Sequence, residues 1–302
     1  MNLKQLIEKS WARHEVETEA VATELEEGIE LLEGTDPEGV AAFMHLVNHA
    51  IGDHGADRAR ALRACESAFG KLTEGSSKSP LLHLAVARHL AGDQSAAAAA
   101  EAELGDGTVG EIQVRLQVAQ GKSHEKQWGE SAALYYACLE SSDSLGEGHG
   151  AEQATAVASN NIASALLHAK DRDELQSELM ERAAQAARKY WLRVGEWTQH
   201  ERADYLLALV HNSLGRHREA LAFAERGLKT IADNGGQKVD QAFIYLTIAE
   251  ACAKQGNAEA HQLAILNARA LSDEFGDDDL LKWFEDELAK VSNPSAGWIQ
   301  GT

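Results

Sequence analysis

Apolar and small residues recur along most of the chain at the three- and four-residue spacing of helices that are buried on one face. Residues 205–231 give the clearest example. Leu207 and Ala208 lie on one face of a predicted helix, and Gly215 lies where that helix ends, a position that often needs a positive φ. A second helix follows, with small residues along one side: Ala220, Ala224 and Gly227. This stretch therefore predicts a helical hairpin.

The hairpin pattern repeats from residue 40 to residue 271. Each predicted first helix has one position where a small residue follows a larger apolar one: Val47, Ala85, Ala119, Ala163, Ala208 and Ala249. The successive intervals are 38, 34, 44, 45 and 41 residues. The chain has only 3 Pro, and good helix formers dominate its composition. We therefore predict an all-α fold, an α-α superhelix of roughly five to six hairpins in which each hairpin packs on its neighbours.

This pattern divides the chain into four segments. Residues 1–36 predict an N-terminal helical pair that packs on the solenoid. Residues 37–276 contain the repeats. Residues 277–291 predict a C-terminal capping helix with one apolar stripe: Leu280, Leu281, Phe284 and Leu288. Residues 292–302 predict a flexible tail.

The hairpins resemble the tetratricopeptide repeat (TPR) family, in the long-helix variants found in bacterial signalling and regulatory proteins. Leu207 and Ala208 match the Leu-then-small pair of that family's helix A, and Ala220 matches its helix B. The chain departs from the family at Asp204, where Trp is common, and at His211, where Tyr is common. One interval equals the family period of about 34 residues, and the others are longer. The resemblance implies a non-catalytic, TPR-like solenoid that binds a peptide or helix in a concave groove.

The resemblance also places particular side chains in that groove. The predicted peptide-binding residues are Asn48, His89, Gln113, Gln120, His124, Asn160, His168, Arg202, Tyr205, Asn212, Phe243 and Glu250. Three more positions belong to the same set: Met44, Ser164 and Lys254. Asn and Gln side chains can hydrogen-bond a peptide backbone, and Tyr or Phe can cover an apolar side chain. We therefore expect a protein or peptide ligand.

The charge balance narrows the class of partner. The chain has 28 Lys and Arg against 48 Asp and Glu, which gives a formal net charge of −20. Such a surface repels nucleic acid and anionic lipid. We therefore expect neither nucleic acid nor a membrane as partner, and a charge-driven protein partner would be basic. The sequence does not indicate the identity of the partner or the oligomeric state.

Cysteine usage and the N-terminus indicate a compartment. Cys65, Cys138 and Cys252 are far apart and form no CxxC motif, which is typical of small buried residues in a reducing environment. Residues 1–20 lack the apolar region of a signal peptide, and no window approaches 18 consecutive apolar residues. We therefore expect a cytoplasmic location.

No sequence motif indicates catalysis or a cofactor. The GxSxG, P-loop and GxGxxG patterns are absent, so we expect no enzyme and no bound cofactor. His45 and His49 share a helix face, and Asp53 and His54 follow, a combination that can ligate zinc or another divalent ion. With 13 His in the chain, chance pairs are expected, so interfacial or surface histidines are the simpler interpretation. A metal-binding protein or metalloenzyme is one alternative function. A scaffold that self-associates through the apolar edge of its first or last hairpin is another.

Overall fold

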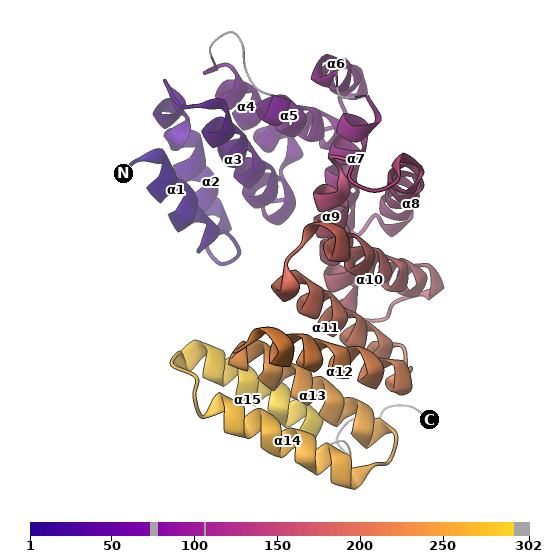
Figure 1. Ribbon diagram of the computed structural model, residues 1–302. Helices are drawn as coiled ribbons and strands as arrows, with labels where there is room; N and C mark the ends of the chain where they lie inside the picture. Colours follow the sequence, from indigo (N-terminus) through magenta and orange to yellow (C-terminus); the bar gives the residue numbers. More distant parts are fainter. Residues whose placement is uncertain (73–77, 106, 293–302) are drawn as a thin grey trace. The chain divides into compact units, whose positions relative to one another are not determined.

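The computed structural model describes residues 1–72, 78–105 and 107–292, and over these residues the chain is helical and has no strand (Figure 1). The helices in chain order are α1 (Leu3–Trp11), α2 (Thr18–Glu27), η1 (Gly28–Leu32), α3 (Pro37–Val47), η2 (Asn48–His54), α4 (Arg58–Phe69), α5 (Lys78–Leu90), α6 (Gln94–Leu104), α7 (Thr108–His124), α8 (Trp128–Leu145), α9 (Glu152–Leu167), α10 (Glu174–Val194), α11 (Trp197–Ser213), α12 (His217–Asn234), α13 (Lys238–Lys254), α14 (Ala258–Ser272) and α15 (Asp278–Ser292). The predicted all-α fold is confirmed. The predicted tail lies outside the described residues, apart from Ser292.

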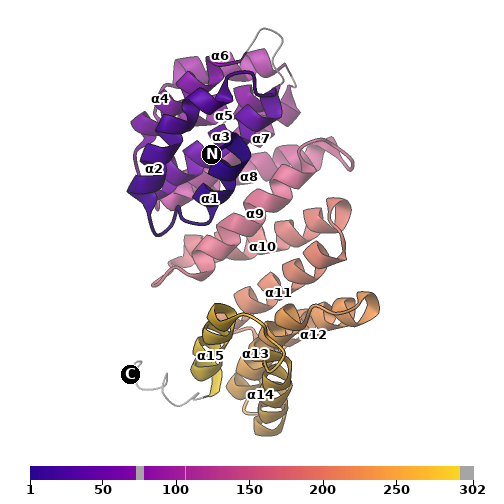
Figure 2. The same ribbon diagram turned by 90° about the vertical axis from the view of Figure 1, so that its left-hand side faces the viewer.

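The chain divides into two compact units, Met1–Ala158 and Ser159–Thr302, and the boundary falls within α9. Neighbouring helices pack in pairs inside each unit. In the first unit α5 pairs with α6, and α7 pairs with α8. In the second unit α11 pairs with α12 and α13 with α14, and α15 packs beside α13 and α14 (Figures 1 and 2). This is the pairwise packing of a helical repeat fold.

Small residues at the predicted positions let paired helices approach closely. All six of these positions are fully buried: Val47, Ala85, Ala119, Ala163, Ala208 and Ala249. In two hairpins, a side chain of the second helix also donates a hydrogen bond to the backbone carbonyl of the small residue on the first helix. Ser131 donates its hydroxyl to the carbonyl of Ala119 at 2.8 Å, and His261 donates Nδ1–H to the carbonyl of Ala249 at 2.9 Å. Both bonds span twelve residues, so one register holds in both units.

A buried asparagine joins successive hairpins in each unit. Asn48 Nδ2 donates to the carbonyl of His83, and Asn212 Nδ2 donates to the carbonyl of Thr247, each at 3.0 Å and each across 35 residues. The two asparagines are only 7% and 6% exposed. Each carbonyl lies inside a helix and also accepts the backbone N–H four residues later, so the asparagine is its second donor, and the bond satisfies the buried side-chain amide. The first helix of one hairpin is therefore fixed to the first helix of the next by the same bond in both units.

This bond corrects the predicted register of the first hairpin. When the two asparagines are aligned, Met44 rather than Val47 corresponds to Ala208. The interval from Met44 to Ala85 is then 41 residues, equal to the interval from Ala208 to Ala249. A search for small residues passes over Met44 because it is large, although the side chain is fully buried.

Residues 52–55 (Gly-Asp-His-Gly) have a composition typical of a turn, which would be the sequence prediction here, but it is wrong because the chain continues to His54 as the π-helix η2. The N–H of Gly55 donates to the carbonyl of Ala50 at 3.0 Å, which is the five-residue bond of a π-helix. A Cβ atom on Gly52 would lie 2.7 Å from Nη1 of Arg58. Glycine at this position therefore leaves room for the guanidinium beside the widened turn.

The end helices of the described chain pack on the hairpins of their own units. In the first unit Leu6, Leu25 and Leu32 share one core with Phe43 of α3. In the second unit Phe284 of α15 lies in the core formed by α13 and α14. Among the described residues, no helix has both the length and the hydrophobicity that crossing a bilayer requires.

Candidate functional site

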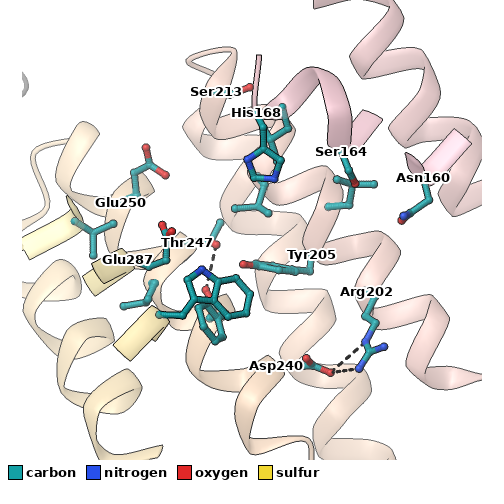
Figure 3. A pocket seen from close by; sticks show the side chains of 17 residues that line it. Asn160, Ser164, His168, Arg202, Tyr205, Ser213, Asp240, Thr247, Glu250 and Glu287 are labelled. Atoms are coloured by element: carbon teal, nitrogen blue, oxygen red, sulfur yellow. Dashed lines mark hydrogen bonds and ion pairs between the residues drawn. The ribbon is translucent and has the colours of Figure 1, made fainter. Parts of the chain in front are cut away.

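A pocket of about 540 Å³ lies in the second unit among α9, α11, α13 and α15 (Figure 3). The first three of these are the predicted first helices of successive hairpins. The volume is within the usual range of ligand sites in proteins. The lining residues are Asn160, Ser164, Leu167, His168, Arg202, Tyr205, Leu206, Leu209, Ser213, Asp240, Phe243, Leu246, Thr247, Glu250, Trp283, Glu287 and Val291.

Half of the predicted groove residues line this pocket. They are Asn160, His168, Arg202, Tyr205, Phe243 and Glu250. Ser164, from the same predicted set, lines the pocket as well. Asn212 lies beside the wall, where its Nδ2 donates to Oε2 of Glu250 at 3.2 Å. The repeat register brings these residues together because equivalent helices turn equivalent faces toward the same space.

Other predicted groove residues lie in the first unit and contact local partners. His89 lies between two acceptors, with Nδ1 at 2.9 Å from Oε1 of Gln94 and Nε2 at 3.1 Å from Oε1 of Glu101. Gln113 donates Nε2–H to the carbonyl of Gly150 at 3.0 Å. These side chains stabilise turns and helix ends of their own unit.

The last three predicted residues also lie in the first unit. Asn48 is occupied by the bond that joins the start of η2 to α5. Gln120 places Nε2 at 3.5 Å from the carbonyl of Leu116. His124 ends α7, and its Nε2 lies 3.9 Å from Oδ2 of Asp53. The structure therefore separates the predicted groove residues between two units with different surroundings.

Ten lining residues were outside the predicted set: Leu167, Leu206, Leu209, Ser213, Asp240, Leu246, Thr247, Trp283, Glu287 and Val291. Asp240 and Thr247 lie on α13, and Trp283 and Glu287 lie on α15. The repeat register does not extend to α15, because that helix follows the last hairpin. The available signal was the apolar stripe of α15, since Trp283 stands directly before the stripe residue Phe284.

One wall of the pocket is aromatic. The ring centroids of Phe243 and Trp283 are 4.4 Å apart, and Phe284 contacts Phe243 edge-on at 5.8 Å. Phe243 is 6% exposed, whereas Trp283 is 55% exposed. Burial raises the pKa of Tyr205 well above its usual range, so its hydroxyl stays protonated. The wall is therefore an uncharged aromatic surface with one indole open to solvent.

Carboxylates outnumber cationic groups in the pocket lining. Asp240, Glu250 and Glu287 carry negative charge, and Arg202 is the one Lys or Arg among the lining residues. Arg202 donates Nε–H and Nη2–H to Oδ2 of Asp240 at 3.3 and 3.2 Å. Figure 3 shows this pair on one side of Tyr205 and the two glutamates on the other. The side near Glu250 and Glu287 therefore favours a cation.

A buried carboxyl group stands next to the Arg202–Asp240 pair. The Glu201 side chain is fully buried, its Oε1 lies 3.6 Å from Nε of Arg202, and neither oxygen has a hydrogen-bond partner among the described residues. Burial, reinforced by the neighbouring Asp240 carboxylate, raises the pKa of Glu201 to about 8. Glu201 is therefore mostly protonated at neutral pH. Nothing in the sequence distinguishes this glutamate from the many exposed ones.

The predicted metal candidates His49, Asp53 and His54 lie in or beside a histidine cluster in the first unit, whereas His45 does not. The rings of His49 and His54 have centroids 4.7 Å apart, and His14 lies 4.8 Å from His54. His124 lies 5.8 Å from both His49 and His54. His45 is not among the residues whose ligand atoms converge. The sequence indicated neither His14 nor His124 as a member of this cluster, because packing alone brings these distant segments to η2.

The sequence matches no known protein family, and no curated protein is detectably similar to it. Among solved structures, the chain is similar to the crystal structure of BtubC (BKLC) from P. vanneervenii. The TM-score is 0.48 and the sequence identity is 14%, over 92% of this chain and 95% of that chain. That level of similarity assigns neither a family nor a function to this chain.

Proposed function

We propose that this chain is a non-catalytic binding protein whose second unit holds a basic side chain of a partner polypeptide in the pocket among α9, α11, α13 and α15. The observation that carries the proposal is the combination of the exposed Trp283 indole with the carboxylates of Glu250 and Glu287 in one pocket. A guanidinium or ammonium group is attracted to an aromatic face and to carboxylates at the same time.

Hydrogen bonds within the second unit support this proposal, because they hold the side chains of Glu250 and Glu287 in place. Glu250 accepts a hydrogen bond from Asn212 at 3.2 Å, and Glu287 accepts one from Nζ of Lys290 at 2.7 Å. Asn212 is itself fixed by its bond to Thr247. Carboxylates that are already oriented lose little conformational entropy when a ligand binds.

The overall charge of the chain supports a basic partner. A net charge of −20 raises the local concentration of cationic ligands and speeds their association at low ionic strength. The hairpin register, with its buried alanines, supports the view that the chain is TPR-like, and TPR-like grooves bind peptides or helices. Cys65, Cys138 and Cys252 are all buried and unpaired, which supports a location in the reducing cytoplasm.

The experiment is a binding assay with labelled heptapeptides that differ only at a central Arg, Lys, Gln or Glu. We expect the Arg and Lys peptides to bind and the affinity to fall as salt is added. Glu287→Gln should weaken binding of the Arg peptide about threefold, because one partly exposed charge pair is lost. Asp286→Asn, an exposed neighbour on the same helix, is the matched control and should bind normally. Equal binding of the Arg and Glu peptides would contradict the proposal.

A second candidate function is self-association through α14. Leu263 and Leu266 on this helix of the last hairpin are 58% and 62% exposed, and their three-residue spacing places them next to each other on one face. Light scattering over a concentration range tests this candidate. A chain that stays monomeric, and behaves in the same way as a Leu263→Glu variant, excludes it.

A further inference from the structure

We propose that the first unit binds one transition-metal ion, with Zn²⁺ as the best fit, through the imidazoles of His14, His49 and His54. One ring nitrogen of each residue lies within 4.8 Å of one ring nitrogen of the other two. This site is separate from the pocket of the second unit, and its function does not depend on that pocket.

The first step of the argument is the hydrogen bonding of the two inner rings. His14 Nδ1 lies 2.8 Å from the carbonyl of Trp11, and a carbonyl can only accept, so Nδ1 carries the proton. His49 Nδ1 lies 3.2 Å from Oδ2 of Asp53, and an ionised carboxylate can also only accept. In both neutral rings the lone pair is therefore on Nε2.

These two lone pairs face each other. Nε2 of His14 and Nε2 of His49 are 3.1 Å apart. Two acceptors at this distance repel unless a cation lies between them, either a proton or a metal ion. Zinc–nitrogen bonds of about 2.0–2.1 Å place two tetrahedral ligands roughly 3.4 Å apart. The observed separation is close to that value, so both nitrogens can contact one ion with little movement.

A third imidazole favours a metal ion over a shared proton. The ring of His54 lies 4.8 Å from that of His14 and 4.7 Å from that of His49, centroid to centroid. A proton is satisfied by two nitrogens, whereas Zn²⁺ takes three or four ligands. Imidazole donors without thiolates also suit Cu²⁺ and Ni²⁺, so the class is a divalent transition metal.

The surroundings of His49 match the outer shell of known metal sites. Metal-binding histidines usually donate their second N–H to a carboxylate or a carbonyl, which fixes the ring and the tautomer. His49 donates to Asp53, and His14 donates to Trp11. Asp53 is held in turn by Nη1 of Arg58, which donates to its Oδ1 at 2.7 Å. Asp53 therefore acts as a positioning residue rather than as a ligand.

The π-helix brings two of the ligands together. Residues five apart point to different faces of an α-helix, but the wider turn of η2 places the rings of His49 and His54 in contact. His14 is buried and comes from the turn between α1 and α2, whereas His54 is exposed, so the ion can enter from solvent. A bound ion would clamp the α1–α2 turn to η2.

The test is a titration of Zn²⁺ into the untagged 302-residue chain after removal of metals with a chelator. We expect one ion per chain by calorimetry and by metal analysis, and visible absorption bands of bound Co²⁺ that Zn²⁺ abolishes. His54→Ala should weaken binding by about 100-fold or more, and Asp53→Asn by about 10–100-fold. Because His54 is exposed, circular dichroism should show that this variant keeps its helices.

The matched control is His45→Gln, since His45 lies one turn away on the same segment but outside the cluster. Its affinity for Zn²⁺ should equal that of the unchanged chain. Absence of stoichiometric metal binding overturns the proposal. Binding that survives His54→Ala but is lost in His124→Ala also overturns it, because the ion would then be held by the neighbouring group of His49, Asp53 and His124.

Discussion

The two units share one connection between hairpins but differ in the side chains next to it. Asn48 and Asn212 each bond a carbonyl 35 residues further along the chain. Beside Asn48 the chain presents a cluster of imidazoles, whereas beside Asn212 it presents carboxylates and aromatic rings. Neither buried asparagine is therefore the residue that distinguishes the two sites.

This difference shows which positions the repeat constrains. The buried asparagines and alanines are constrained because helix axes must keep a fixed separation and every buried side-chain amide must be paired. The exposed faces between them have no such requirement, so the same hairpin can carry different chemistry in each unit. Four changes, from the largest expected effect to the smallest, test this contrast.

The largest effect should come from Glu201, whose aligned position in the first unit is Pro37. The pKa of about 8 in the folded state exceeds that of the unfolded chain, so the folded state binds more protons. This contribution to stability is fully present below about pH 4.5 and is lost as pH rises through 8. Glu201→Gln should remove this dependence of the unfolding free energy on pH. It should also stabilise the chain at pH 9 by roughly 2–4 kcal/mol.

Urea denaturation of both proteins at several pH values between 5 and 9 measures the effect. If the unfolding free energies of the unchanged chain and the Glu201→Gln variant change with pH in parallel, Glu201 ionises normally in the folded chain. The second unit would then lose a feature that separates it from the first.

Removal of the asparagine hydrogen bond between hairpins should have the next largest effect. The loss of stability should be similar in the two units. Asn212→Ala removes the second donor from the carbonyl of Thr247, and Asn48→Ala does the same to His83. Each should lower the free energy of unfolding by about 1–2 kcal/mol, from the lost hydrogen bond and the cavity that the smaller side chain leaves. Asn234→Ala is the control, because this exposed amide bonds only within its own helix. A loss of stability in only one of the two asparagine variants would show that the two bonds are not equivalent.

Truncation of the exposed indole should affect binding more than folding. Trp283→Ala should weaken binding of the Arg heptapeptide about tenfold, because the guanidinium loses contact with an aromatic face. The melting temperature should change little, since the Trp283 side chain is more than half exposed. Fluorescence polarisation and thermal melts measure the two effects. An unchanged affinity would place the contact elsewhere and leave the second unit without a demonstrated site.

The smallest effect should come from Arg202, which is 61% exposed. Arg202→Ala should change stability by less than about 1 kcal/mol, as is usual for exposed ion pairs. The same change removes the one Lys or Arg from the pocket lining and should tighten binding of the Arg peptide by about twofold. The same polarisation assay detects the change. Weaker binding would indicate that Arg202 contacts the peptide directly.

The sequence predicted the hairpins because close packing requires small residues at a nearly regular interval, as Ala85 and Ala249 show. It also predicted seven of the 17 residues that line the pocket, since Tyr205 and Phe243 occupy equivalent faces of equivalent helices. Trp283 was missed because α15 follows the last repeat. His14 was missed because its approach to η2 depends on tertiary packing, which has no local sequence pattern.

The asparagine connection has a consequence for how such chains can be recombined. Its acceptor is a backbone carbonyl, a group that every residue has, so the junction places no demand on the identity of the residue at position 83 or 247. Hairpins that contain these positions are therefore interchangeable in principle, and a chimera that joins the segment before His83 directly to Thr247 would keep the 35-residue spacing and the bond. Protein engineers can use this junction as a splice point that moves a binding face without redesign of the interior.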